Sequence, residues 1–352
     1  MRIYLVDGAC GNLRNASQGL DLFLGSGNAN KAIKWAGDGL SIFLGADSNG
    51  TRKHSDVASA ALAVADFTRD IRLRCLLSFY YYAKVDLDSM FSPDVPEPII
   101  MADSGAFSAL TLGVPINISD YANWLKRWEC RLSVYANLDV IGDPKATLDN
   151  QRRLEDKGLA PLPVFHVNEP WEYLEYYLEN YDYVALGGLV PHAMRVSSLM
   201  PWLIKAFKML PKGKGYHGFG VTGWTILKSF PWASVDSTSW SIGYRYGRVP
   251  LFSPVEGKLV SAYLGDPVSC YRYRHLFEYC GYDWKDFADR TKNTRAKIAG
   301  VSAVSYLRIE EWLRRKHAKA MKVYLSTIPG DFEKLKEGTN GKHSLRYIGG
   351  NG

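Results

Sequence analysis

Three aspartates stand at the ends of three short apolar segments that lie far apart in the sequence. Asp103 follows the run Pro-Ile-Ile-Met-Ala, Asp139 follows Val-Tyr-Ala-Asn-Leu, and Asp236 follows Trp-Ala-Ser-Val. We expect each run to be a buried strand. In an α/β barrel the carboxyl ends of all strands open onto one face, where the substrate binds. The spacing therefore predicts that the three carboxylates converge on that face and form an active site.

Glycine and histidine mark the ends of other predicted strands. Tyr-Val-Ala-Leu is followed by Gly187-Gly188-Leu189, and a later strand carries His217-Gly218-Phe219. Glycines in such places either make a tight turn or let backbone amides approach a planar ligand closely. His166 also falls at a strand end, where a histidine is more often a hydrogen-bonded structural residue than a catalyst.

The segments that position these residues have the pattern of a parallel α/β fold. Short apolar runs without strict alternation predict strands that are covered on both faces. Helical patterns separate the later runs, which implies parallel crossover connections. Asp143 before Pro144 opens one helix and is sufficiently explained as its cap. We expect a (β/α)8 TIM-like barrel with a basic helical C-terminal extension. The predicted strands are 2–6, 40–44, 74–80, 98–102, 134–138, 161–167, 183–186, 215–219 and 232–235.

The pattern changes after residue 240. Aromatic and basic residues alternate around residues 244–248 and 271–275, and residues 285–322 predict one or two long basic helices. We expect the barrel at 1–255, a basic helical part packed on it at 256–330, and a flexible, glycine-rich tail at 331–352. Charge runs are usually solvated faces, but this part holds the candidate nucleic-acid contacts. These are Arg245, Arg272, Arg274, Arg308, Arg314 and Arg315.

Composition limits the classes of protein that the chain can belong to. It has 352 residues, 47% of them hydrophobic, and a formal charge of +7. This length suffices for one large core, and the charge weakly favours a polyanionic partner. The five scattered cysteines argue against a disulfide framework. No apolar stretch reaches the ~18 residues of a membrane span and the start lacks a signal-peptide pattern, so we expect a cytoplasmic protein without membrane contact.

Familiar cofactor motifs are missing. No Gly-x-Gly-x-x-Gly follows a strand, and there is neither a phosphate-binding loop nor a serine nucleophile elbow. Dinucleotide redox chemistry and nucleotide hydrolysis therefore lack support. Cys270, His275 and Cys280 have no fourth zinc ligand at a familiar spacing. We expect no metal and no other cofactor.

The strand-end motifs, taken in order, resemble those of the tRNA-guanine transglycosylase superfamily. Its members have a (β/α)8 barrel with an Asp-Ser-Gly-Gly-aromatic motif, a base-recognising aspartate, a Gly-Gly-Leu turn and a nucleophilic aspartate. An arginine and a glycine that follow the nucleophile in the family match Arg245 and Gly247, and the resemblance spans about 98–247. The matching segments are Asp103-Ser104-Gly105-Ala106-Phe107, Leu138-Asp139, Gly187-Gly188-Leu189, Gly218-Phe219-Gly220 and Asp236.

Two departures refine the resemblance. Ala106 replaces the second glycine of the first motif, and the family's C-terminal Cys-x-Cys-x-x-Cys…His zinc site is absent. The tRNA enzymes use that module around their RNA. The chain is thus similar to the shorter phage-type branch, which exchanges guanine in DNA for a 7-deazaguanine. This implies DNA and a free, preQ0-like 7-deazaguanine base as partners, in the host cytoplasm if the protein is phage-encoded.

The resemblance also implies roles for the site residues. Asp236 would attack the anomeric carbon and form a covalent intermediate, as in glycoside hydrolysis. Asp103 would transfer the proton to the leaving base, and Asp139 would accept hydrogen bonds from the donors of a guanine-type edge. The other residues expected to line the base are Ser104, Phe107, Gly187, Gly188, Leu189, His217, Gly218 and Phe219.

Three alternatives stay open. One is a tRNA-guanine transglycosylase with the same chemistry on a different polymer. Another is a non-catalytic nucleic-acid-binding homologue, against which the presence of all three aspartates argues. A third is a barrel glycosidase that acts on carbohydrate, for which Trp240 alone is thin support. The sequence leaves the oligomeric state open.

Overall fold

A computed structural model describes most of the chain. The described residues are 2–5, 41–44, 74–90, 98–189, 196–212, 214–221, 223–241, 246–292 and 295–326. The predicted tail at 331–352 and the candidate Arg245 lie outside them.

The described residues form one main sheet of nine strands, and every strand pairing in it is parallel. The strands occur where the sequence predicts them, and those whose side chains are described are almost wholly buried, as strands covered on both faces must be. Their bounds are β1 (Arg2–Leu5), β2 (Ser41–Leu44), β3 (Arg74–Ser78), β4 (Ile99–Asp103), β5 (Leu132–Tyr135), β6 (Val164–His166), β7 (Tyr183–Gly187), β8 (Gly215–Gly218) and β9 (Ser234–Ser237).

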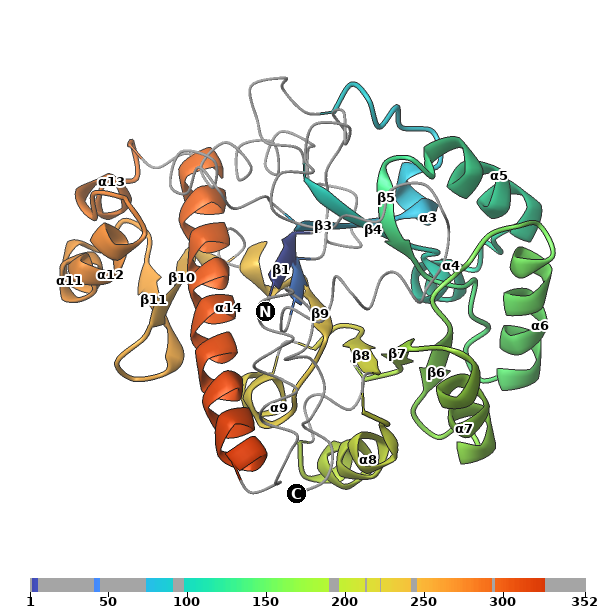
Figure 1. Ribbon diagram of the computed structural model, residues 1–352. Coiled ribbons are helices and arrows are strands. Elements are labelled where there is room, and N and C mark those ends of the chain that lie inside the picture. Colours follow the sequence, from blue (N-terminus) through green and yellow to red (C-terminus); the bar gives the residue numbers. More distant parts are fainter. Residues whose placement is uncertain are drawn as a thin grey trace.

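Helices lie outside the strands and connect them (Figure 1). A short helix, α3 (Phe79–Tyr82), follows β3, and two helices lie between β4 and β5. One helix then follows each of the next four strands, which agrees with the predicted strand–helix alternation. Asp143 accepts a hydrogen bond from the Ala146 amide (2.9 Å), so its predicted role as a cap is confirmed. The bounds are α4 (Ala106–Leu112), α5 (Ile118–Trp128), α6 (Pro144–Glu155), α7 (Trp171–Asn180), α8 (Val196–Met209) and α9 (Trp224–Ser229).

The predicted α/β class is confirmed, whereas a closed eight-stranded barrel is not. The sheet has the order β5-β4-β3-β1-β2-β9-β8-β7-β6, with an additional pairing of β2 and β3. Its two outer strands approach each other just beyond their assigned bounds. Ala136 and Leu162 form an isolated parallel bridge, and the Asn137 amide donates to the Leu162 carbonyl (2.9 Å).

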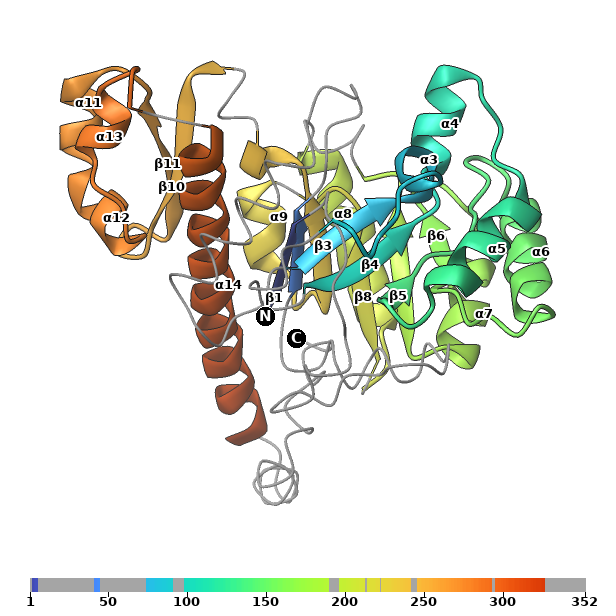
Figure 2. The ribbon, with the colours of Figure 1, turned by 90° about the horizontal axis from the view of Figure 1, so that it is seen from above.

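The C-terminal part is built on an antiparallel hairpin, β10 (Arg248–Ser253) and β11 (Lys258–Tyr263). The expected domain boundary at 255/256 falls in the turn of this hairpin. Figures 1 and 2 show the long helix α14 between this part and the main sheet. No described helix is both long and apolar enough to cross a membrane. The remaining elements are η3 (Ser239–Ser241), α11 (Pro267–Arg272), α12 (Arg274–Tyr279), α13 (Lys285–Ala288) and α14 (Arg295–Ser326).

A buried ion pair joins α14 to the sheet. Arg74 of β3 donates from Nη1 to Oε1 of Glu310 at 2.7 Å, and both side chains are buried. Removing one partner of such a pair leaves a charge in a place from which water is excluded, which is costly. The pair therefore attaches α14 to β3 of the main sheet.

We expect Arg74→Met to lower the free energy of unfolding by about 3–5 kcal/mol, because Glu310 would keep its buried charge without this partner. The double variant Arg74→Met/Glu310→Met should regain most of the loss. Urea denaturation of the variants measures this. Lys292→Met, in an exposed pair with Asp289, is the control and should leave the midpoint unchanged. A double variant as unstable as Arg74→Met would contradict the expectation.

Candidate active site

The three strand-end aspartates come together at the carboxyl end of the sheet. Asp103 is the last residue of β4, Asp236 lies near the end of β9, and Asp139 lies in the loop that follows β5. Burial, followed by the negative charges of Asp139 and Asp236, raises the pKa of Asp103 to about 8. Asp139 and Asp236 are thus near enough to Asp103 to repel its charge, as their strand-end positions predict.

Asp103 is held by the backbone turn that follows it. Its Oδ2 accepts a hydrogen bond from the Gly105 amide (3.0 Å), and Gly105 has a φ of 83°, which favours glycine. A Cβ at this glycine would lie 2.4 Å from Ser78 Oγ. The bond from Gly105 lowers the pKa of Asp103, but burial and the other two carboxylates outweigh it. At neutral pH this carboxyl group therefore keeps its proton.

Asp139 has a different environment. Ser104 Oγ donates to its Oδ1 (3.3 Å), and His166 Nε2 lies 2.8 Å from its Oδ2. The other ring nitrogen of His166, Nδ1, lies 2.8 Å from Glu169 Oε1. Burial alone would lower the pKa of His166, but its hydrogen bonds with Asp139 and Glu169 raise the pKa to about 10. A protonated imidazole thus lies between two carboxylates at neutral pH.

His166 and Glu169 were not among the predicted site residues. At a strand end a structural role is the more frequent one for a histidine such as His166, and the sequence alone indicates no role for Glu169. The signal in the sequence that could have indicated this pair is a histidine at the end of a buried strand with a glutamate three residues later. A turn there lets Glu169 bond back to His166, and the Glu169 carboxylate accepts from the backbone amide of His166 (2.9 Å).

Asp236 is positioned by β8 and by the turn after it. The Gly220 amide donates to its Oδ1 (2.6 Å), and His217 Nε2 lies 3.5 Å from the same oxygen. His217 is fully buried, and its Nδ1 lies 2.6 Å from Ser234 Oγ. Burial lowers the pKa of His217, and the contact with Asp236 offsets this only in part. His217 therefore supports Asp236 as a neutral imidazole, with the ring of Phe219 packed edge-on against it at 4.6 Å.

The predicted glycines leave space for neighbouring side chains, and one of them adopts a left-handed backbone conformation. A Cβ on Gly187 would lie 2.6 Å from Cδ2 of His166, and one on Gly218 would lie 2.7 Å from the Trp232 ring. Gly188 has a φ of 69°, a left-handed conformation that favours glycine. Leu189, also predicted to line the base, is buried in the hydrophobic core.

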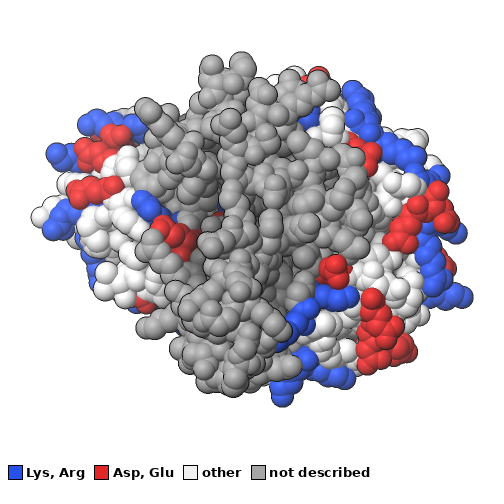
Figure 3. All heavy atoms as spheres, in the orientation of Figure 1, with Lys and Arg blue, Asp and Glu red and all other residues white. Residues whose placement is uncertain are grey.

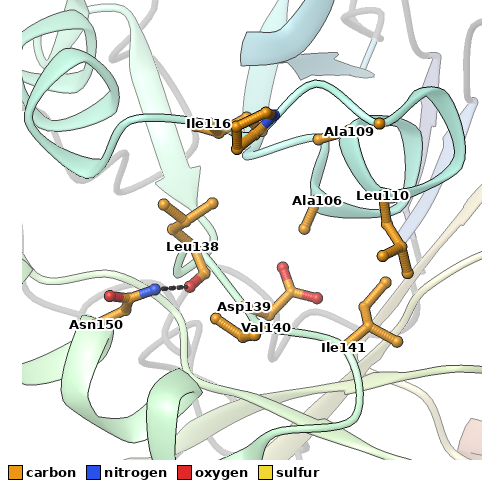
Figure 4. Close-up of a pocket in the computed structure, with 11 residues that line it drawn as sticks. Ala106, Ala109, Leu110, Ile116, Leu138, Asp139, Val140, Ile141 and Asn150 are labelled. Carbon is orange, nitrogen blue, oxygen red and sulfur yellow. Dashed lines mark hydrogen bonds between the residues drawn. The ribbon is translucent and has the colours of Figure 1, made fainter.

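A cavity of about 390 Å³ lies beside Asp139, between α4 and the loop after β5. Its walls are mainly apolar, with Leu110 and Ile141 among them, and Asp139 is the charged residue of its lining. Figure 4 shows the Asp139 carboxylate directed into this cavity toward Ala106 and Leu110. Phe107, on the same helix, has 58% of its surface exposed. The site thus combines a carboxylate with apolar walls, as planar ligands with polar edges require.

The candidate arginines of the C-terminal part differ in their surroundings. Arg272 and Arg274 are exposed, and Arg274 lies over the ring of Tyr271 at 4.3 Å. Arg308 lies over Tyr279 at 4.2 Å and pairs with Glu311 at 3.3 Å. Arg314 and Arg315 belong to α14, but their side chains are outside the described part. On the face shown in Figure 3, basic and acidic side chains of the described residues are interspersed.

The cysteines considered as zinc ligands have separate partners. Cys270 donates from Sγ to the Tyr263 carbonyl (3.3 Å), and Cys280 Sγ lies 3.5 Å from Ser305 Oγ. Within the described residues, no group of three or more His, Cys, Asp or Glu side chains has a metal-binding arrangement.

The proton on Asp103 has a consequence for stability. Its pKa rises from an ordinary 3.8 to about 8 in the folded protein, so folding holds a proton that the unfolded chain releases. Wild-type stability should therefore fall as the pH rises from about 4 to about 8. Asp103→Asn removes this loss, and we expect its Tm to exceed that of the wild type by about 2 °C or more at pH 8, with little difference at pH 4.

Calorimetry at pH 4, 6 and 8 measures this difference. The control is Asp143→Asn, which keeps an acceptor at an exposed helix cap, and whose Tm offset should not change with pH in the same way. An equal offset for Asp103→Asn at all three pH values would show that the fold imposes no cost on the ionised carboxylate.

Comparison with known proteins adds no family assignment. The sequence matches no protein-family model, and no curated protein matches it at a significant level. The roles implied by the resemblance to transglycosylases therefore remain predictions, and their support comes from the residues and the geometry of this site.

Proposed function

We propose that the protein is a pentosyltransferase that replaces guanine in DNA with a 7-deazaguanine derivative through a covalent aspartyl-glycosyl intermediate. The observation that carries the proposal is the meeting of three carboxyl groups, of which Asp103 keeps its proton near neutral pH beside Asp139 and Asp236. Cleavage of a glycosidic bond needs one carboxyl group that gives a proton and another that attacks as an anion. We assign the first role to Asp103 and the second to Asp236.

The proposed fold is a (β/α)8 barrel. Its support is the strand order. When β1 is left out, the strands from β2 to β9 follow one another in sequence order around the sheet, because Leu44 of β2 also pairs with Cys75 of β3. Closure would occur between β5 and β6, where the bridge of Ala136 with Leu162 joins the two outer strands. In such a barrel the strand ends that carry Asp103, Asp139 and Asp236 would face the same opening.

The proposed reaction has two halves. In the first, a carboxylate oxygen of Asp236 attacks the anomeric carbon of the nucleotide, the bond from that carbon to N9 of guanine breaks, and Asp103 gives its proton to the leaving base. In the second, the incoming 7-deazaguanine gives a proton to Asp103, and its N9 attacks the anomeric carbon and releases Asp236. The Gly220 amide and His217 hold the attacking carboxylate in place.

The base would be bound at Asp139. A carboxylate can only accept hydrogen bonds, so it suits the N1 and 2-amino donors of guanine. Phe107 would stack on the purine, and its exposed ring is free to turn toward a ligand. The target nucleotide must leave its stack in the duplex before it enters a site of this kind.

Asp236→Ala should abolish base exchange and the covalent adduct, because it removes the carboxylate that we propose attacks the sugar. The assay is incubation of the full chain with labelled guanine and DNA, followed by denaturing gels that detect a protein–DNA adduct. Asp143→Asn is the matched control and should exchange label at the wild-type rate. An adduct that survives in Asp236→Ala would remove this residue as the nucleophile.

Exchange of the same labelled guanine tests whether the substrate polymer is DNA or tRNA. We expect exchange into DNA and none into tRNA, and binding that weakens with salt through the exposed Arg272 and Arg274. Replacing both by glutamine should reduce the slope of log K against log salt by about 1.8, since each phosphate contact on duplex DNA contributes about 0.9. Arg308→Gln is the comparison variant. It should change the slope less, because Arg308 is already paired with Glu311. Exchange into tRNA alone would assign the protein to the tRNA-modifying alternative.

A further inference from the structure

The ring of His166 contacts a carboxylate at each nitrogen. Nε2 lies 2.8 Å from Asp139 Oδ2, and Nδ1 lies 2.8 Å from Glu169 Oε1. A neutral imidazole has a single N–H donor. In one of the two contacts the lone pair of the unprotonated ring nitrogen would therefore face a lone pair of the carboxylate oxygen. A protonated ring instead donates to both carboxylates. The geometry therefore assigns His166 as a cation that joins Asp139 to Glu169.

Local backbone geometry places Glu169 at this position. Its Oε2 accepts from the His166 amide at 2.9 Å, and its own amide donates to the His166 carbonyl at 3.2 Å. Between them, Asn168 has a φ of 74° and is the only non-glycine residue with a positive φ among the described residues. Such a conformation costs free energy and persists where the surroundings fix it, often at functional sites.

The neighbouring strand β7 fixes the ring from the side. A Cβ on Gly187 would lie 2.6 Å from Cδ2 and 2.9 Å from Nε2 of His166, so a side chain at this position would displace the ring. The Val167 amide also donates to the Gly187 carbonyl (3.2 Å), which fixes the two strands relative to each other. The ends of β6 and β7 thus hold the imidazole against Asp139.

We propose that His166 and Glu169 are positioning residues that hold the Asp139 carboxylate as an oriented acceptor, so that the site selects bases with two adjacent N–H donors. Ser104 donates to Oδ1 and His166 to Oδ2, which leaves each oxygen a further acceptor position. The edge of guanine presents two donors to such a pair, whereas the corresponding edge of adenine presents an acceptor at N1. This inference rests on the proposed function and specifies how its base is chosen.

Other titratable groups also surround this unit. Asp103 interacts electrostatically with Asp139, and it carries a negative charge only when it loses its proton, at a pH near 8. On α7 the buried Tyr177 faces Glu169, and burial followed by the charge of Glu169 raises the pKa of its hydroxyl. Neither group supplies a positive charge, and Arg152 is near enough to lower the pKa of Tyr177. Within the described residues, His166 is the group whose ring nitrogens lie at hydrogen-bond distance from both carboxylates.

The first measurement is histidine NMR on the full chain labelled at Cε1, in which His166→Gln identifies one of the seven histidine signals. We expect His166 to be cationic at pH 8 in the wild type and to titrate at least one pH unit lower in the isosteric Glu169→Gln. A wild-type signal that titrates near the ordinary value of 6.5 would overturn the inference and leave the proposed function intact.

The second measurement is calorimetric binding of free guanine and free adenine at pH 7. Glu169→Gln and Gly187→Ala should each weaken guanine binding about tenfold, which corresponds to about 1.36 kcal/mol, because Asp139 would lose the fixed imidazole that orients it. Glu172→Gln, on the exposed side of α7, is the control and should bind as the wild type does. The wild type should discriminate against adenine.

The two measurements separate the possible failures. A cationic His166 together with unchanged guanine binding in Glu169→Gln and Gly187→Ala would overturn the positioning role. A wild type that binds no guanine and forms no adduct with DNA would overturn the proposed function and its base selection, whereas the NMR titration would still decide whether His166 and Glu169 hold Asp139. Thermal melts of both variants show whether a loss of binding is only a loss of folding.

Discussion

Every pairing in the main sheet is parallel, and this constraint places the ends of β4, β5 and β9 at one edge of the sheet. Residues that follow these strands have to share that edge, whatever their separation in the sequence. Here three of them are aspartates, and their mutual repulsion in a partly buried place cannot be relieved while all three are ionised. Asp103 therefore keeps its proton in the folded protein near neutral pH, and the free energy of unfolding falls as the pH rises toward its pKa.

The surroundings of the three carboxylates make them chemically different. Asp103 accepts hydrogen bonds from the backbone of Ser104 and Gly105, and burial raises its pKa, whereas Asp139 has a cation and a hydroxyl as partners. Asp236 has the Gly220 amide and a neutral, buried imidazole. One residue type is therefore held in three different environments, and the difference arises from partners on β6, β8 and the turns beside them.

The attachment of α14 shows a similar dependence on a buried charge. Arg74 lies on β3, next to the strand that carries Asp103, and its pair with Glu310 is buried between the sheet and the C-terminal part. Such pairs contribute little net stability compared with apolar packing, but they are costly to break. The ion pair thus favours one placement of α14, and with it one placement of the exposed arginines of the C-terminal part relative to the sheet.

The sequence by itself determined the strands, most helices, the α/β class and the positions of the three aspartates, because apolar runs, capping residues and strand–helix alternation are local signals. It also identified Asp143 correctly as a cap, from the proline beside it. Tertiary structure alone decided that β1 lies between β2 and β3, that His166 joins Asp139 to Glu169, and that Gly187 leaves room for the imidazole. It also decided which carboxylate keeps a proton. These features depend on contacts and on electric fields between segments distant in sequence, which no local pattern encodes.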